Sequence, residues 1–369
     1  MNTQELKDAL GILKNALGTK GDIFVGIDNI AFQKNTISAF NSVMSVTIGM
    51  NTGIEGCVHG AELLKIVAKF PNDSETTLEH TDKGLKIVNG RSRPTMAWRD
   101  DNLTEYLAAR KSDIAKAIDL PTKFLGALAA VLIKGNKSEA SGVCVHGDYL
   151  FATNLNALTK ADKWGGIFCD SDIIIPQGVV EFIVGSGIPF EKYYIEKRND
   201  TPVFLHLFAP NIVMCCNLGS IELWRQRGLL ISYLGGKLPS GKEIKGRLTI
   251  AEETPMSGKF GVEFSDCVDR CALLADKNNG KEFVTLNFDK DHVTVTGSNL
   301  NGTAREEIPG EWDVDETLGS CFAVEALEGL SGDVGFVKTE IADVPYVGLV
   351  VVNGDLTVCI MPMCREWRE

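Results

Sequence analysis

The sequence predicts an α+β protein built from three similar modules in tandem. Helical segments with an apolar stripe alternate with groups of strands, and the order helix, strands, helix, strands occurs three times along 369 residues. The period is about one domain length, and the total length suits two or three domains with separate cores. Tandem modules of this kind form either a ring or an extended arc.

Six short amphipathic segments supply the helices of these modules. Three of them carry an apolar stripe at helical spacing, in residues 4–17, 121–135 and 262–276. The second begins at Pro121, a residue that suits the first turn of a helix. The other three, residues 56–70, 173–187 and 319–333, each continue from an apolar strand through a turn into a short helix. The stripe residues are Leu6, Leu10, Leu13 and Leu17; Phe124, Leu128, Val131 and Leu132; and Phe264, Cys267, Cys271 and Leu274.

Turn residues between runs of alternating apolar residues predict antiparallel hairpins between the helices. The turns are Asp82–Gly84, Asp289–Asp291 and Asn353-Gly354. The last of these is the strongest hairpin signal in the chain, because Asn-Gly adopts the tight two-residue turn that matches strand twist. Each hairpin belongs to a module with antiparallel sheets.

Composition and charge narrow the classes of protein. A net charge of −12 argues against a broadly basic surface that grips nucleic acid. No apolar run is long enough to span a membrane, and the polar, amphipathic start does not resemble a signal peptide. We therefore expect a cytoplasmic protein, in which the ten cysteines are reduced and mostly buried.

Motifs for catalysis or metal binding are incomplete. The segment Gly236–Glu243 nearly matches a phosphate-binding loop, but Glu243 stands where a Ser or Thr would hold magnesium. Cys267 and Cys271 share a helix face, yet a zinc site would need two further ligands. Five scattered histidines form no paired motif. The sequence thus predicts no enzyme, no cofactor and no metal. The histidines are His59, His80, His146, His206 and His292.

Four segments, in this order on a threefold repeat, resemble the bacterial DNA polymerase III β subunit, the sliding clamp family. They are "ELLKIVAKFPNDSETTLEHTDKGLKIVNGRSR", "YLFATNLNALTKA", "LGGKLPSGKEI" and the terminal "IMPM". The resemblance covers most of the chain. Its departures from the family pattern would suit a phage or plasmid replication system.

The resemblance implies three tandem DNA-clamp domains, residues 1–112, 113–247 and 248–369, each with two helices packed on antiparallel sheets. Two such chains would close head to tail into a homodimeric ring around duplex DNA, held by topology and independent of sequence. A clamp-loader ATPase would open the ring, and DNA polymerase would dock on it. The expected location is the bacterial nucleoid, or the host cytoplasm for a phage-encoded member.

The resemblance also implies a pocket for partner peptides between the second and third domains. Met-Pro-Met near the end of the chain would line it, together with residues of the other segments. Leu155-Asn156-Ala157 replaces the family's Gly-His-Arg, and Glu243 and Cys364 stand where Arg is usual, so we expect a less basic pocket. The implied lining residues are Thr153, Leu155, Leu158, Pro239, Ile244, Ile360, Met361, Pro362 and Met363. Trp367 follows four residues after Met363, and we expect it to pack at the pocket edge.

Two further residue sets follow from the resemblance. Positive charge on the inner helices would make the acidic chain compatible with DNA in the hole, although the helices near Val179 and Ala326 lack lysines. Pro94 stands where the family more often has an aromatic residue, which predicts a weaker seam. The DNA-facing set is Lys7, Lys14, Lys20, Lys65, Lys69, Lys123, Lys134, Arg270 and Lys277. The seam between subunits would include Met96 on an edge strand, and Leu273 and Leu274 at the end of a helix.

Two other functions remain open at this point. The chain could be a repeat scaffold or protein-interaction module that holds no DNA, or an enzyme whose site is assembled from scattered residues such as those near Gly236. Positive potential along the helix-lined face would favour the clamp over the scaffold. Measurable ATP binding would favour the enzyme.

Overall fold

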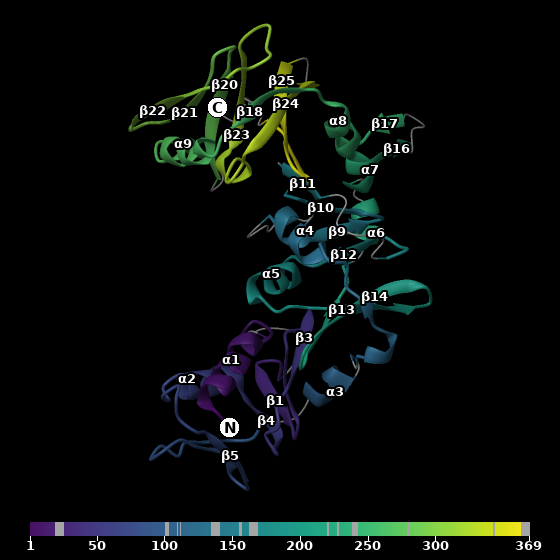
Figure 1. The fold of residues 1–369 in the computed structure, drawn as a ribbon, viewed down its shortest axis with the longest axis vertical. Coiled ribbons are helices and arrows are strands. Elements are labelled where there is room, and N and C mark those ends of the chain that lie inside the picture. Colours follow the sequence, from purple (N-terminus) through teal and green to yellow (C-terminus); the bar gives the residue numbers. More distant parts are fainter. Residues whose placement is uncertain are drawn as a thin grey trace. The chain divides into compact units, whose positions relative to one another are not determined.

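The structure is a computed structural model. Its described part divides into two compact units (Figure 1). Unit 1 comprises Met1–Thr122 and Gly178–Gly219, and unit 2 comprises Lys123–Gln177 and Ser220–Glu369. In the described part no helix is both long and apolar enough to cross a membrane. The expected domain boundaries after residues 112 and 247 stay predictions. The described residues are 1–18, 26–99, 103–108, 110, 112–133, 141–154, 157–161, 169–219, 221–226, 229–237, 243–278, 281–341 and 344–362.

Unit 1 is built on an eight-stranded antiparallel sheet in the order β4-β1-β2-β3-β15-β14-β13-β8. A second, three-stranded sheet has the order β5-β6-β7. The helices are α1 (Thr3–Lys14), α2 (Gly60–Val67), α3 (Leu103–Ala108) and α5 (Gln177–Ser186), with a 3-10 turn at Ile114–Lys116. The strands are β1 (Asn29–Gln33), β2 (Thr36–Phe40), β3 (Met44–Gly49), β4 (Glu55–His59), β5 (Thr77–Thr81), β6 (Gly84–Val88), β7 (Thr95–Met96), β8 (Ile118–Asp119), β13 (Lys192–Arg198), β14 (Thr201–Ala209) and β15 (Ile212–Asn217).

Helices α1 and α2 pack against each other, as Figure 1 shows. The predicted stripe of α1 is confirmed, because Leu6, Leu10 and Leu13 are buried. The helix begins where the Asn2 side chain accepts hydrogen bonds from the first free backbone amides. Burial of one apolar face fixes this short helix, since an isolated helix of its length would be marginal in water.

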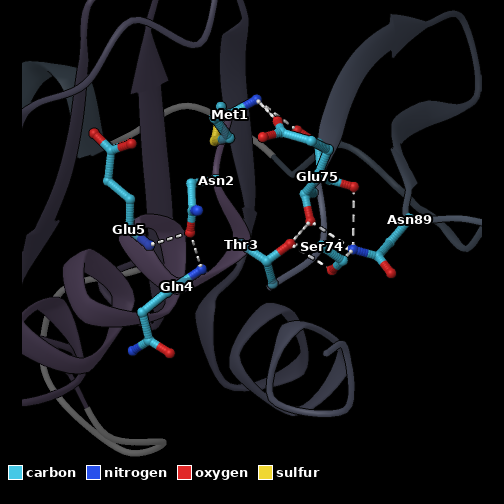
Figure 2. Close-up of polar contacts among 9 residues, drawn as sticks. Met1, Asn2, Thr3, Gln4, Glu5, Ser74, Glu75 and Asn89 are labelled. Atoms are coloured by element: carbon cyan, nitrogen blue, oxygen red, sulfur yellow. Dashed lines mark hydrogen bonds and ion pairs between the residues drawn. The ribbon is translucent and has the colours of Figure 1, made fainter. Parts of the chain in front are cut away.

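A buried polar network joins the start of α1 to the hairpin β5–β6 (Figure 2). The Asn89 amide nitrogen donates to Thr3 Oγ1 at 3.1 Å and to Ser74 Oγ at 2.6 Å, and Thr3 Oγ1 lies 2.8 Å from Thr76 Oγ1. The N-terminal ammonium lies 3.2 Å from a carboxylate oxygen of Glu75. Because buried polar groups are costly when unpaired, this network fixes the position of α1.

Unit 2 contains two larger sheets. One has the order β12-β9-β10-β11-β26-β25-β24-β18, and the other has the order β19-β20-β21-β22 with β23 also paired to β20. The helices are α4 (Phe124–Val131), α6 (Ile221–Gln226), α7 (Leu229–Leu234), α8 (Arg247–Glu253) and α9 (Glu263–Ala272), with a 3-10 turn at Val324–Ala326. The strands are β9 (Val143–His146), β10 (Tyr149–Thr153), β11 (Ala157–Ala161), β12 (Ile173–Ile175), β16 (Gly235–Lys237), β17 (Glu243–Lys245), β18 (Met256–Phe260), β19 (Asp276–Asn278), β20 (Lys281–Phe288), β21 (His292–Asn299), β22 (Gly302–Pro309), β23 (Leu318–Ala323), β24 (Gly332–Ile341), β25 (Val344–Asn353) and β26 (Leu356–Ile360).

The three predicted hairpins are confirmed as β5–β6, β20–β21 and β25–β26. Two helix predictions need correction. The helix expected from Pro121 begins at Phe124, and the one expected in residues 319–333 is a single 3-10 turn at Val324–Ala326. Gly329 and Gly332, both at positive φ, follow that turn and favour its early end.

Both ends of Gly236–Glu243, the segment that nearly matches a phosphate-binding loop, lie in the strands of a hairpin. Strands β16 and β17 pair antiparallel, with Gly236 opposite Ile244, whereas a phosphate-binding loop joins a strand to the start of a helix. The residues between these strands lie outside the described part. The flanking strands therefore do not provide the frame that phosphate binding requires.

Most of the described cysteines are buried free thiols, as expected. Burial raises the pKa of both Cys215 and Cys359 to about 12. Such thiols stay protonated near neutral pH and are poor nucleophiles. Within the described residues, no group of histidine, cysteine and acidic side chains is arranged to hold a metal.

His206 is fully buried between β13 and β15 in unit 1. Its Nδ1 lies 2.6 Å from Ser112 Oγ, and its Nε2 lies 3.4 Å from a carboxylate oxygen of Glu196. The ring also stacks on Tyr194. Burial lowers the pKa of His206 from its ordinary 6.5, although Glu196 partly opposes this shift.

Unit 1 should therefore lose stability as the pH falls below about 6.5, because the unfolded chain then binds a proton that folded His206 does not. The stabilisation is complete above the unfolded pKa and declines towards the lower folded pKa. Urea midpoints between about pH 5 and 8 measure it. His206→Gln should flatten the slope relative to the wild type, and the exposed-site variant His80→Gln should not. Parallel slopes in wild type and His206→Gln would contradict this assignment.

Candidate functional site

One face of the long unit 2 sheet collects several of the predicted pocket residues. The register pairs Thr153 with Leu158, Leu158 with Cys359, and Cys359 with Val350. Directly paired residues of neighbouring strands share a face, so these four side chains form a continuous row across β10, β11, β26 and β25. Met361 follows two residues after Cys359, just beyond the end of β26.

Helices α6, α7 and α8 contribute to the apolar cluster on this face. Trp224, Tyr233 and Leu248 are buried in one cluster with Leu158 and Cys359. The Tyr233 hydroxyl lies 3.2 Å from Thr153 Oγ1, which also donates to the carbonyl of Ala157 at 2.8 Å. Thr153 is therefore a satisfied core residue that anchors α7 to the sheet.

The same face is less well covered towards β24 and β25. Val337 and Val352 are only partly buried against this cluster, and Leu234 at the end of α7 is partly buried as well. Met361 is also partly exposed, while Pro362 is buried. We call Leu234, Val337 and Val352 the open rim. It offers aliphatic surface that can accept apolar side chains.

Ile360 lies on the opposite face of the sheet. It pairs with Ala157 and Leu349, and all three belong to the core shared with α9 and β20. Cys359 therefore takes the place on the Leu158 face that the sequence analysis gave to Ile360. The two-residue period counted from Leu158 across the β11–β26 pairing would have identified Cys359, but that pairing is not visible in the sequence.

The remaining predicted pocket residues lie outside what the structure describes. These are Leu155, Pro239 and Met363, together with the side chain of Ile244, whose backbone belongs to β17. The tail that carries Cys364 and Trp367 lies outside it as well. Their part in the pocket stays a prediction.

Two basic residues beside the apolar row were missed by the sequence analysis. Lys160 is almost fully buried on β11, contacts the Glu252 carboxylate, and lies with its Nζ 4.2 Å from the Tyr149 ring centroid. The Arg247 guanidinium lies 5.5 Å from the Tyr233 ring centroid. Both cations partly offset the rise in the pKa of Cys359 that burial causes. Positive charge thus borders the row even though Glu243 replaces the expected arginine.

Four of the predicted DNA-facing cations already have partners. Lys7 Nζ donates to the carbonyl of Phe70 at 2.6 Å and to Asn72 Oδ1 at 2.7 Å, which ties α1 to the end of α2. Arg270 forms a two-bond contact with Glu306. Lys277 lies 2.7 Å from Glu282, and Lys123 lies 3.5 Å from Asp355.

Three other lysines of the set are exposed and carry unpaired charge. Lys14 ends α1, Lys65 lies on α2, and Lys69 follows that helix just after its last residue, Val67. None of the three forms an ion pair with any residue in the described ranges. Lys20 and Lys134 lie outside those ranges. Free positive charge of the predicted set is therefore placed on α1 and α2.

The predicted seam residues lie near two strand edges. One edge, that of β7, belongs to unit 1, and the other, that of β22, belongs to unit 2. Strand β7 has β6 as its only neighbour among the described strands, and β22 likewise has only β21. Leu273, just after α9, is 81% exposed, whereas Met96 on β7 is only 5% exposed. Leu274 lies against the start of β22, with Cδ1 3.7 Å from where a Cβ on Gly302 would be. Unpaired edges and an exposed leucine suit strand addition by another chain.

Comparisons with solved structures identify the fold as that of bacterial sliding clamps. This chain matches those structures over nearly its whole length. No protein-family model and no characterised sequence matches this chain.

Two of these structures illustrate the likeness. The DNA polymerase III subunit beta sliding clamp of Bartonella birtlesii, bound to griselimycin, is 16% identical, with a TM-score of 0.75 over 99% of this chain and 98% of that one. The Helicobacter pylori beta clamp, bound to a DNA ligase peptide, is 16% identical, with a TM-score of 0.70 over 99% of both chains.

Proposed function

We propose that the protein is a sliding clamp, a non-enzymatic processivity factor that encircles duplex DNA and tethers a DNA polymerase. The observation that carries this proposal is the match to sliding-clamp structures over 99% of this chain and 98% of the Bartonella protein. The three domains would be residues 1–112, 113–247 and 248–369, and the place of action would be the cytoplasm.

The ring would close between two copies of the chain, head to tail. Strand β22 of one copy would add to strand β7 of the other, because each has an unpaired edge in the described structure. Leu273 would supply apolar burial at this seam, and Leu274 would support it against β22. Met96 is already buried in its own subunit, so it would support the seam by packing within its own sheet and not by direct contact with the partner.

The apolar row and the open rim would bind short peptides from partner proteins. Leu158, Cys359 and Val350 would lie beneath the peptide, since they are already buried in the single chain, and Met361 would continue the row. The Helicobacter pylori clamp was solved with a DNA ligase peptide, which supports a peptide site on this fold. DNA polymerase and the clamp-loader ATPase would compete for it. Leu155, Pro239, Ile244, Pro362 and Met363 complete the proposed lining, with Ile360 behind it in the core.

Contact with DNA would depend on few charges, so binding of the free protein should be weak and independent of sequence. Lys14, Lys65 and Lys69 are the cations that the described structure leaves unpaired on α1 and α2. Lys7 would help by holding the two helices together. An acidic chain can then slide, because topology rather than contact energy retains it.

Reversing two of these charges tests the proposed DNA face. In Lys65→Glu/Lys69→Glu, affinity for a linear duplex at low salt should fall roughly 10-fold or more, since two phosphate contacts become repulsive. The control Lys338→Glu changes an exposed lysine in unit 2. Fluorescence anisotropy over a salt series measures both. Tight, sequence-specific binding of the wild type to short duplexes would contradict the proposal.

A further inference from the structure

A cavity of about 340 Å³ with a mixed, mainly apolar lining lies within unit 1. Strands β1, β2, β3 and β15 line it on one side, and helix α3, Arg110 and Ser112 line it on the other. This is within the size range of small-molecule sites. The cavity contains none of the proposed peptide-site, DNA-facing or seam residues.

Neutral hydrogen-bonding groups line much of this cavity. Thr36, Ser45 and Thr47 contribute hydroxyls from the sheet, and Ser112 contributes another that is held by His206. Thr47 Oγ1 is bonded to Ser38, at 2.9 Å. The Thr36 hydroxyl and the Gln33 amide, in contrast, have no hydrogen-bond partner among the described residues. These groups can donate to and accept from a hydroxylated ligand.

Arg110 is the cation of the cavity. Its Nη1 donates to the carbonyl of Tyr106 at 3.2 Å and its Nη2 to Asn217 Oδ1 at 3.3 Å. The guanidinium carbon lies 4.4 Å from the Phe40 ring centroid and 5.4 Å from that of Phe204. The guanidinium is therefore held in one orientation by two aromatic rings and two neutral acceptors.

Among the described residues, no acid compensates the charge of Arg110. None of their carboxylates forms an ion pair with it, and none of their acceptors bonds its buried Nε. Burial lowers the pKa of Arg110, as expected for a cation that loses water without gaining an anion. A guanidinium that is partly withdrawn from water and has no acidic partner retains the capacity to bind an oxyanion.

We propose that this cavity binds a small hydroxylated oxyanion, a sugar phosphate or a hydroxy acid. The oxyanion would bind the guanidinium of Arg110, which can offer two parallel N–H donors to a phosphate or carboxylate. The side chain would leave its present orientation to do so, because Nε is buried and Nη2 donates to Asn217. The hydroxyl groups of the ligand would meet Thr36, Gln33 and Ser45. A lone phosphate would leave most of the cavity unfilled, and a cation would be repelled by Arg110.

Calorimetric titration of the full chain tests the proposal with ribose 5-phosphate, gluconate and neutral ribose at matched ionic strength. The wild type should bind ribose 5-phosphate or gluconate saturably and should not bind ribose. The preferred compound separates a phosphate from a carboxylate ligand. Failure of both anions to bind at concentrations of up to about 10 mM would overturn the proposal, because a site with a Kd of about 1 mM or lower would be mostly occupied there.

Variants locate the binding. Arg110→Met keeps the stacking between the rings but removes the charge, and should weaken binding at least about tenfold. The control Arg305→Met removes an exposed arginine in unit 2 and should bind as the wild type does. Thr36→Val, a milder change, should weaken binding several-fold even if Arg110→Met does not fold. Unchanged affinity in either cavity variant would overturn the assignment, and the result does not depend on the protein acting as a clamp.

Discussion

Replacing Leu273 by Asp should convert a dimer of twice 40.1 kDa into monomers. Leu273 is 81% exposed in the single chain, so the substitution leaves the fold intact. In the proposed ring the same side chain is buried at the seam, where an unpaired carboxylate is strongly disfavoured. A cost of about 3 kcal/mol at each seam weakens each contact about 100-fold.

The matched control is Val262→Asp, because Val262 is 84% exposed at the opposite end of α9 from Leu273. Sedimentation equilibrium of the wild type and both variants gives the masses. The seam is confirmed if the wild type and Val262→Asp are dimers and Leu273→Asp is a monomer. A Leu273→Asp dimer as stable as the wild type would exclude it. Unfolding curves of the three proteins should coincide.

Replacing Val337 by Lys should weaken peptide binding roughly 30-fold or more without unfolding the protein. Val337 is partly buried on the rim of the apolar row, so its lysine can reach solvent in the free protein. A bound peptide would cover this position and leave the ammonium without water or an anion. The expected loss is at least about 2 kcal/mol, or roughly 30-fold in affinity.

Fluorescence polarisation with a labelled copy of the DNA ligase peptide measures this loss, and griselimycin serves as a competitor. Val43→Lys, a partly exposed valine of unit 1, is the control and should bind as the wild type does. Equal affinity in wild type and Val337→Lys would place the peptide elsewhere. If the wild type binds neither ligand, the proposed row is not the site for ligands of this kind.

The elements of the fold could be predicted because their signals are local. The leucine stripe of α1 and the Asn353-Gly354 turn each specify structure within a few residues. The short helix expected around Ala326 became a 3-10 turn, since Gly329 and Gly332 at positive φ follow it. The spacing of the apolar residues in this segment did not indicate how soon the helical backbone would end.

The candidate site was only partly predictable, because it depends on pairing between distant strands. Leu158 and Cys359 are 201 positions apart and meet only through the β11–β26 register, which decides that Cys359 and not Ile360 shares the face. The hydrogen-bond or ion-pair partner of each cation could not be predicted from the sequence either. Nothing in the sequence near Lys7 indicates that it binds the carbonyl of Phe70. Arg110 was missed because its two aromatic neighbours come from distant strands.

Retention on circular DNA tests the central claim most directly. The wild type, a clamp-loader ATPase and ATP are incubated with nicked circular DNA, and the complex is isolated by gel filtration in high salt. A single restriction cut then linearises half of the sample. The account predicts that the protein stays with the intact circles and is lost from the linear DNA, since only topology holds it. Equal retention on both forms, or none on the circles, would contradict a sliding clamp.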